Sequence, residues 1–132
     1  MKITDIKTIR AEQYLFVQVY TDEGITGLGE SGTWAYLEAS EAVIHRFKHY
    51  LIGQDPLQIE HHWQYLYRAH HFRGSAIMGA LAAIDIALWD LAGKYYHVPV
   101  YRLLGGKCRE QVRVYNHTAG RTEEELIENA KK

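Results

Sequence analysis

The stretch YLFVQVYTDEGITGLGE, residues 14–30, decides the fold of this chain. Its first half, Tyr14–Thr21, predicts a β-strand because β-branched and aromatic residues dominate it in alternation with other side chains. The sequence Asp22-Glu23-Gly24 is typical of a turn, and Ile25–Glu30 predicts a strand that returns from that turn. The stretch therefore predicts a β-hairpin.

A less regular strand is expected ahead of the hairpin, at Lys2–Ile9. β-Branched residues dominate this run, but Ile3 and Lys7 would share one face, so its alternation is imperfect. Three strands that follow one another so closely predict a small antiparallel sheet.

The spacing of apolar residues then changes to that of helices. A first helix is expected over residues 37–52, with Ser31 or Thr33 as its cap. A second is expected to begin at Asp55-Pro56, a pair that suits a helix start, and a third carries an apolar stripe over residues 77–95. The pattern predicts an α+β fold, in which a small antiparallel three-stranded sheet is followed by a helical bundle.

The C-terminal part begins a second unit. Residues 99–104 predict a short helical turn, Val112–His117 predicts a strand, and Thr122–Glu125 opens a last helix with acids where the helix dipole favours them. A strand followed by the beginning of a helix is half of a βαβ unit. We therefore expect two domains, at residues 1–110 and 111–132.

Composition excludes several classes of protein. The chain has 132 residues, is 47% hydrophobic and 23% charged, and is therefore neither disordered nor collagen-like. Its net charge of −1, without a block of basic residues, argues against a nucleic-acid partner. A single cysteine, Cys108, excludes an internal disulfide and indicates a reducing compartment, so we expect a cytoplasmic protein.

The sequence predicts neither a signal peptide nor a membrane partner. Residues 1–10 carry charges and lack an apolar core. The most apolar stretch, Ala76–Gly93, is interrupted by Asp85 and Asp90 and predicts a buried helix rather than a membrane span.

Glycines at positions 27, 29 and 32 match the G-x-G-x-x-G pattern of dinucleotide-binding proteins. The strand before them closes a hairpin, however, whereas a dinucleotide fold needs a parallel partner strand about 20 residues later. We therefore favour a structural role, in which the glycines ease the exit from a strand.

Eight histidines raise the question of a metal site. No H-E-x-x-H motif is present, and the adjacent pairs His61-His62 and His70-His71 point to different sides of a helix. Surface or interface histidines are the favoured interpretation, with His71 kept as a candidate because it lies in a predicted loop. For Asp85, in the third helix, a hydrogen-bonded structural acid is favoured over a catalytic carboxylate, because no second acid or base accompanies it.

Four motifs stand out along the chain: YTDEGITGLGE at 20–30, LIGQDP at 51–56, AIDIALWDLAGK at 83–94 and VYRLLGG at 100–106. In this order they resemble the N-terminal capping domain of the enolase superfamily, in its mandelate racemase/muconate lactonizing enzyme group. Two further segments, Trp63–Arg68 and Val114–His117, look most like sugar-acid dehydratases of the mannonate and galactonate type. The resemblance implies that residues 111–132 begin a truncated (β/α) barrel.

The resemblance also implies a chemistry. Enzymes of this group bind Mg²⁺ through three acids at barrel strand ends, and a Lys or His base removes the α-proton of a carboxylate substrate. A β-hydroxyl then leaves in a dehydratase. All of those ligands and bases lie on later barrel strands, so this chain contains none of them, and we expect it to be inactive alone.

The resemblance carries four substrate-binding candidates onto this chain. Trp34 and Tyr36 lie in the loop after the third strand, which touches substrate in the family, and His117 matches a substrate-contacting histidine at the end of the first barrel strand. Arg73 is a weaker candidate for binding an acid sugar. The loop between the first two strands is reduced to residues 11–13, so a neighbouring subunit of a homo-oligomer is expected to close the pocket.

Two functions of different classes remain open. One is the capping portion of a metal-dependent lyase that acts on an acid sugar. The other is a non-catalytic, stand-alone module that binds a partner or a small acid through the same loops. Continuation of the sequence past Lys132 into barrel strands would distinguish them.

Overall fold

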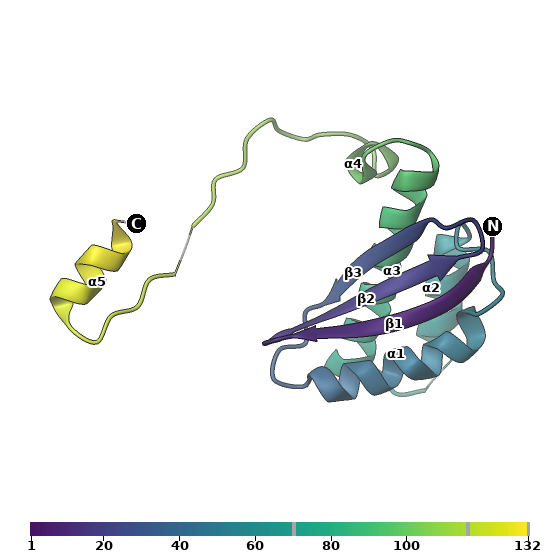
Figure 1. The fold of residues 1–132 in the computed structure, drawn as a ribbon, viewed down its shortest axis with the longest axis horizontal. Helices are drawn as coiled ribbons and strands as arrows, with labels where there is room; N and C mark the ends of the chain where they lie inside the picture. Colours follow the sequence, from purple (N-terminus) through teal and green to yellow (C-terminus); the bar gives the residue numbers. More distant parts are fainter. Residues whose placement is uncertain (70, 116, 132) are drawn as a thin grey trace.

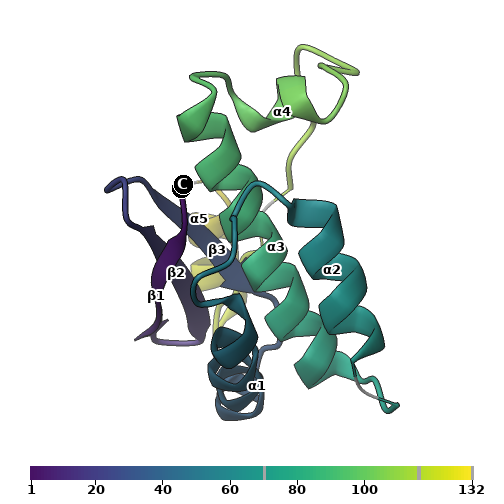
Figure 2. The same cartoon turned by 90° about the vertical axis from the view of Figure 1, so that its right-hand side faces the viewer.

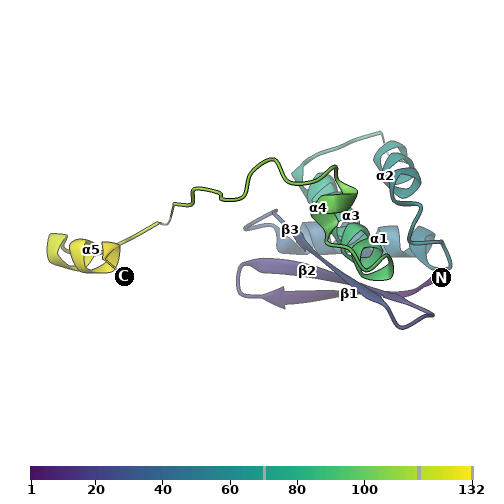
Figure 3. The same cartoon turned by 90° about the horizontal axis from the view of Figure 1, so that it is seen from above.

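The computed structural model describes residues 1–69, 71–115 and 117–131, and it is a three-stranded sheet covered on one face by helices (Figures 1 and 3). The sheet order is β1-β2-β3 and both pairings are antiparallel. The predicted α+β class is confirmed. The elements are β1 (Ile3–Ala11), β2 (Tyr14–Thr21), β3 (Thr26–Ser31), α1 (Leu37–Leu51), α2 (Ile59–Arg68), α3 (Ser75–Tyr95), α4 (Val100–Leu103) and α5 (Glu123–Ala130).

A bulge resolves the imperfect alternation of β1. Ile3 lies opposite Thr21 whereas Asp5 lies opposite Tyr20, so the register shifts by one residue between them. Ile3 and Ile6 are consequently both buried, at 1% exposure. The expectation that Ile3 and Lys7 share a face is wrong, because Lys7 is exposed.

The contact between β3 and α3 explains the glycine motif. A Cβ atom on Gly27 or Gly29 would lie 2.0 Å from the carbonyl oxygen of Ala87 or Ala83 on α3. Only glycine permits so close an approach. The structural interpretation of these glycines is confirmed.

Side chains of α3 also cover the free edge of β3. The backbone N–H of Leu28 donates to Oδ2 of Asp90 at 2.8 Å, and Nζ of Lys94 donates to the carbonyl oxygen of Thr26 at 2.8 Å. Asp90 and Lys94 form an ion pair at 2.7 Å. The edge of β3 is therefore occupied, which removes a site for unwanted strand pairing.

Helix α3 forms the centre of the helical layer, between the sheet and α2 (Figure 2). Of the described helices, it alone is long and apolar enough to cross a membrane by length and composition. Its buried side chains instead contribute much of the core: Ala80, Leu81, Ala83, Ile84, Ala87, Leu88, Leu91 and Ala92. The predicted buried helix is confirmed.

The starts of α1 and α2 differ from the predictions. Helix α1 begins at Leu37, so its N-cap is Tyr36, and no side chain caps it. The expected caps, Ser31 and Thr33, lie ahead of this position, and their hydroxyls bond to each other. Helix α2 begins at Ile59, and Asp55 instead accepts a hydrogen bond from the N–H of Leu57. That bond stabilises a turn ahead of the helix.

The C-terminal segment extends away from the sheet and its helices (Figure 1). The short helix α4 is present as predicted, and Thr122 caps α5 by accepting from the N–H of Glu125 at 3.2 Å. The strand predicted at Val112–His117 is not formed in its described residues, 112–115 and 117. A strand needs a neighbouring strand for its hydrogen bonds, and none lies beside this segment in the described chain.

Candidate functional site

The loop between β3 and α1 forms the rim of a surface cavity. Trp34 and Tyr36 are exposed to 61% and 68%, unusual values for aromatic side chains in a folded domain. The cavity measures about 540 Å³, and its other wall is the beginning of α3. The described residues that line it are Gly32, Thr33, Trp34, Tyr36, Ser75, Gly79 and Ala82.

Buried hydroxyl groups fasten this loop to α3. Oγ of Ser31 and Oγ1 of Thr33 lie 3.1 Å apart, and Oγ1 of Thr33 donates to the carbonyl oxygen of Ser75 at 3.5 Å. A Cβ on Gly79 would lie 1.9 Å from that Thr33 oxygen. The sequence analysis missed this cluster, although a glycine inside a helix signals such a close approach.

Two further features fix the shape of the rim. Ala35 has φ 68°, a left-handed conformation that non-glycine residues rarely adopt. The indole of Trp34 lies edge-on to the ring of Tyr14, with centroids 6.5 Å apart. The left-handed residue and the ring contact together define the conformation of the loop.

Arg73 is held in place by the end of α2. Its Nε donates to the carbonyl oxygen of Tyr67 at 3.0 Å, and its guanidinium carbon lies 4.2 Å from the centroid of the Tyr67 ring. Tyr67 in turn stacks on Trp63 at 4.8 Å. No hydrogen bond within the described chain engages the terminal nitrogens of Arg73, and such a guanidinium is suited to bind a carboxylate.

The structure brings only two of the four candidates together. Trp34 and Tyr36 line one cavity, whereas Arg73 and His117 are not among its lining residues. His117 lies in the extended C-terminal segment, where its ring is edge-on to Tyr115 at 5.2 Å. That segment contains no strand in its described residues, so the strand-end position expected for His117 is not formed.

The described residues do not fit a magnesium site. No three of their His, Cys, Asp and Glu side chains converge closely enough to hold a metal ion. Mg²⁺ requires carboxylate and other oxygen ligands in near-octahedral geometry.

His62 is a structural histidine. Its Nε2 lies 2.8 Å from the carbonyl oxygen of Asp55, and because a carbonyl only accepts, Nε2 carries the proton. Its Nδ1 then accepts from the hydroxyl of Tyr50 at 3.0 Å. Burial lowers the pKa of His62, which favours this neutral form.

Asp85 lies half-buried on α3. Burial is the main cause that raises the pKa of the Asp85 carboxyl group, and the nearby negative charge of Glu60 raises it further. No donor in the described part of the chain bonds to its carboxyl group, so the structural hydrogen bond expected for Asp85 is not found there.

Comparison with known proteins places this chain in a family. The model of the mandelate racemase / muconate lactonizing enzyme N-terminal domain matches residues 2–105. The chain belongs to this family. The four motifs that carried the resemblance lie in the sheet, at the end of α1 and just after it, in α3, and over α4 and the turn that follows it.

Curated relatives of this mandelate racemase / muconate lactonizing enzyme domain are sugar-acid dehydratases. The chain is 46% identical over 134 residues to a D-galactonate dehydratase of Pectobacterium atrosepticum, covering 100% of this chain and 35% of the relative. It is 43% identical over 130 residues to one of Verminephrobacter eiseniae, covering 97% and 34%. The chain therefore spans about a third of the length of these relatives.

Solved structures of the enolase superfamily share the fold of this mandelate racemase / muconate lactonizing enzyme domain. An enolase of Pantoea ananatis with bound D-gluconate and Mg has a TM-score of 0.85 and 39% identity, covering 98% of this chain and 33% of that chain. A dehydratase-like protein of Zymomonas mobilis has a TM-score of 0.86 and 35% identity, covering 98% and 39%. The family and fold expected from the sequence are confirmed.

Proposed function

We propose that this chain is the capping portion of a metal-dependent dehydratase that acts on an acid sugar of the galactonate type. The observation that carries the proposal is the Trp34–Tyr36 rim, which is fastened to α3 by the bond from Thr33 to Ser75 and lies beside a cavity. The similarity to D-galactonate dehydratases supports the substrate class.

In this proposal the chain binds and encloses substrate. The exposed rings of Trp34 and Tyr36 contact the C–H faces of the sugar and exclude water from it. Arg73, held by Tyr67, and His117 bind polar groups of the same substrate.

The proton-transfer chemistry is assigned to a barrel that begins at residue 111. A base there would remove the α-proton, and the β-hydroxyl would leave with a proton as water. The unpaired extended backbone of residues 111–115 supports this boundary. The Mg²⁺ expected for the family would be held outside this chain, because its described residues contain no suitable ligand group.

A chimera tests the proposal. The matching N-terminal third of the Pectobacterium D-galactonate dehydratase is replaced by this chain, and turnover of D-galactonate is measured. We expect dehydration by the chimera and none by the 132-residue chain alone. A chimera that melts cooperatively but does not turn over D-galactonate would contradict the proposal.

The alternative function, a stand-alone binding module, makes a different prediction for the isolated chain. D-Galactonate titrated into the 132-residue chain alone would then release heat at a defined stoichiometry. We expect no such binding, because Trp34 and Tyr36 form only one wall of a substrate pocket.

A further inference from the structure

The residues on either side of the Trp34–Tyr36 rim are both bonded to the first turn of α3. Ahead of the rim, Oγ1 of Thr33 donates to the carbonyl oxygen of Ser75. After the rim, Oγ of Ser40 donates to the carbonyl oxygen of Ala76 at 3.2 Å. The rim is therefore held at two points, on consecutive carbonyl groups of one helix.

The hydroxyl groups ahead of the rim form a directed chain. Because the single hydroxyl proton of Thr33 goes to Ser75, its Oγ1 accepts the proton of the Ser31 hydroxyl at 3.1 Å. Ser31 is fully buried, so removal of the Thr33 oxygen would deprive a buried donor of this acceptor. Gly79 leaves the space that both hydroxyl groups occupy.

Ser40 connects the last residue of the rim to α3. Its backbone N–H donates to the carbonyl oxygen of Tyr36 at 3.3 Å, and its buried side chain donates to Ala76. One residue is thus bonded both to the rim and to the helix that forms the other wall of the cavity.

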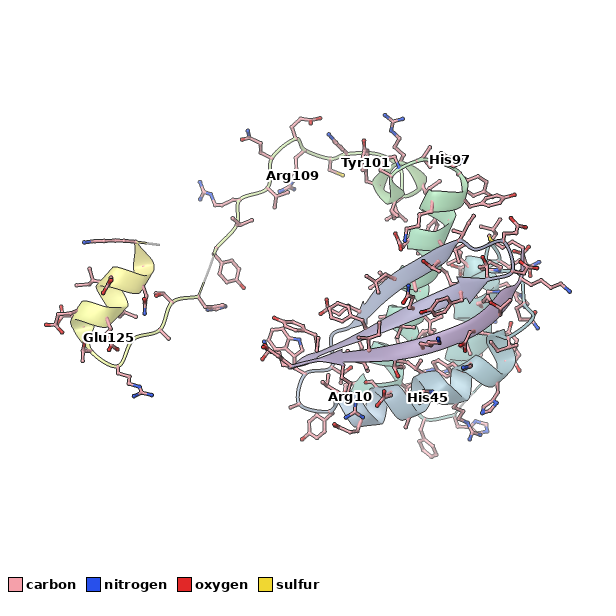
Figure 4. All side chains as sticks on the ribbon, viewed as in Figure 1. Arg10, His45, His97, Tyr101, Arg109 and Glu125 are labelled. Carbon is pink, nitrogen blue, oxygen red and sulfur yellow. The ribbon has the colours of Figure 1, made fainter. Side chains whose placement is uncertain are left out.

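A different set of contacts holds the start of α1 on its other side. Arg10, at the end of β1, pairs with Glu38 and Glu41 of α1 (Figure 4). These pairs tie α1 to β1 and not to α3, and ion pairs of exposed side chains are weakened by solvent. The position of the rim relative to α3 therefore depends on the buried hydroxyl groups.

We propose that Thr33 and Ser40 are positioning residues that act on the substrate through the rim. They hold the rings of Trp34 and Tyr36 over the cavity, so that the rings meet the substrate without first being ordered. The inference rests on the proposed function, because it requires the rim to contact the sugar.

Kinetics of the chimera with D-galactonate test these roles. Thr33→Val and Ser40→Ala should each raise KM by ~3-fold or more and leave kcat within ~2-fold, because contacts made equally before and during the reaction affect KM. Thr33→Ser keeps the hydroxyl group and should keep the KM of the unsubstituted chimera. In a chimera that lacks the rim rings, Trp34→Ala/Tyr36→Ala, the further change Thr33→Val should not raise KM again.

A matched control separates positioning from stability. Thr21 is also buried, and its Oγ1 donates to the carbonyl oxygen of Ile25 at 2.8 Å, but it lies at the opposite end of the sheet from Ser31. Thr21→Val should lower the melting temperature and leave KM unchanged, because a loss of folded enzyme lowers the apparent kcat and not KM.

Hydrogen exchange gives a second readout, which does not need turnover. Deuterium uptake by the chimera over residues 33–40 should be faster in Thr33→Val and Ser40→Ala, and unchanged in Thr21→Val. A folded chimera without turnover would contradict the proposed function, whereas exchange would still decide whether Thr33 and Ser40 hold the rim.

Four results would overturn the inference itself. They are unchanged uptake over residues 33–40, an unchanged KM in Thr33→Val and Ser40→Ala, a KM raised equally by Thr21→Val or Thr33→Ser, and a further rise of KM in the chimera without the rim rings.

Discussion

At the scale of single residues, the aromatic rim is where exposure and the proposed substrate contact coincide. Trp34 is exposed while its loop is fixed by the buried Ser31 and Thr33 hydroxyls. A substitution at Trp34 therefore removes a surface side chain without opening the core.

Trp34→Ala and His117→Ala, made in the chimera, test the proposed substrate contacts. We expect kcat/KM for D-galactonate to fall by ~10-fold or more in each, equivalent to ~1.4 kcal/mol of transition-state binding. The melting temperature should change little. Unchanged kinetics in both variants would contradict the assignment, and a lower melting temperature with full activity would indicate a structural role.

His62 makes stability depend on pH. Its pKa is lowered in the folded chain, so the unfolded chain takes up a proton first as the pH falls below about 6.5. The contribution of His62 is therefore fully present above that pH and is lost as the pH falls toward the folded-state pKa. Urea unfolding of His62→Gln should show a shallower pH dependence below pH ~6.5 than the parent. The same slope in both proteins would contradict the assignment.

At the scale of elements, the contact of β3 with α3 holds the sheet against the helical layer. Gly29 meets the backbone of Ala83, and a helix backbone cannot yield as a flexible side chain does. A methyl group at Gly29 would therefore lower the stability of the fold by overpacking this contact.

Gly29→Ala should lower the free energy of unfolding by ~2 kcal/mol or more, as overpacked sites do. Gly32→Ala is the matched control, because a Cβ at that position has no atom within 4 Å, and it should cost less than ~0.5 kcal/mol. Denaturant unfolding of both variants measures the difference. Equal stability of the two would contradict the close approach seen in the structure.

The elements also show what the sequence predicts well and what it does not. Local patterns predicted β2, α3, α4 and the start of α5, because alternation, helical spacing and the helix dipole act between near neighbours. The bulge in β1 depends on the pairing of residues that are distant in sequence, such as Ile3 with Thr21, and the pattern within β1 does not predict it. The late start of α2 follows from a local turn, because Asp55 accepts a hydrogen bond from the N–H of Leu57 ahead of the helix.

The candidate site shows the same difference between what local patterns predict and what depends on contacts between distant residues. The resemblance nominated Trp34 and Tyr36, but the bond from Thr33 to Ser75, 42 residues away in sequence, appears only in the fold. The strand expected at His117 needs neighbours that the described chain does not supply. The substrate-binding role of His117 therefore stays a prediction.

At the scale of the whole molecule, the chain combines a packed domain with an unpacked C-terminal segment. Val112, Val114 and Tyr115 are all exposed to more than two-thirds. Apolar side chains so placed are typical of surfaces that another part of a protein covers.

The isolated chain should not bind Mg²⁺ tightly. Titration calorimetry is expected to show no micromolar site, because three oxygen ligands do not converge among the described residues. The Pantoea ananatis protein, which has bound Mg, is the positive control. A micromolar site in this chain would contradict the assignment of the metal to a region outside it.

The covered edge of β3 has a consequence for how the sheet can grow. Asp90 and Lys94 occupy that edge, whereas over Lys7–Ala11 no bond from another element of the described chain reaches the outer backbone of β1. A sheet with one open edge can add only one partner. Two copies that join β1 to β1 would be related by a twofold axis and would leave both outer edges closed. Pairing through the sheet would therefore stop at a symmetric pair and would not propagate into a fibre.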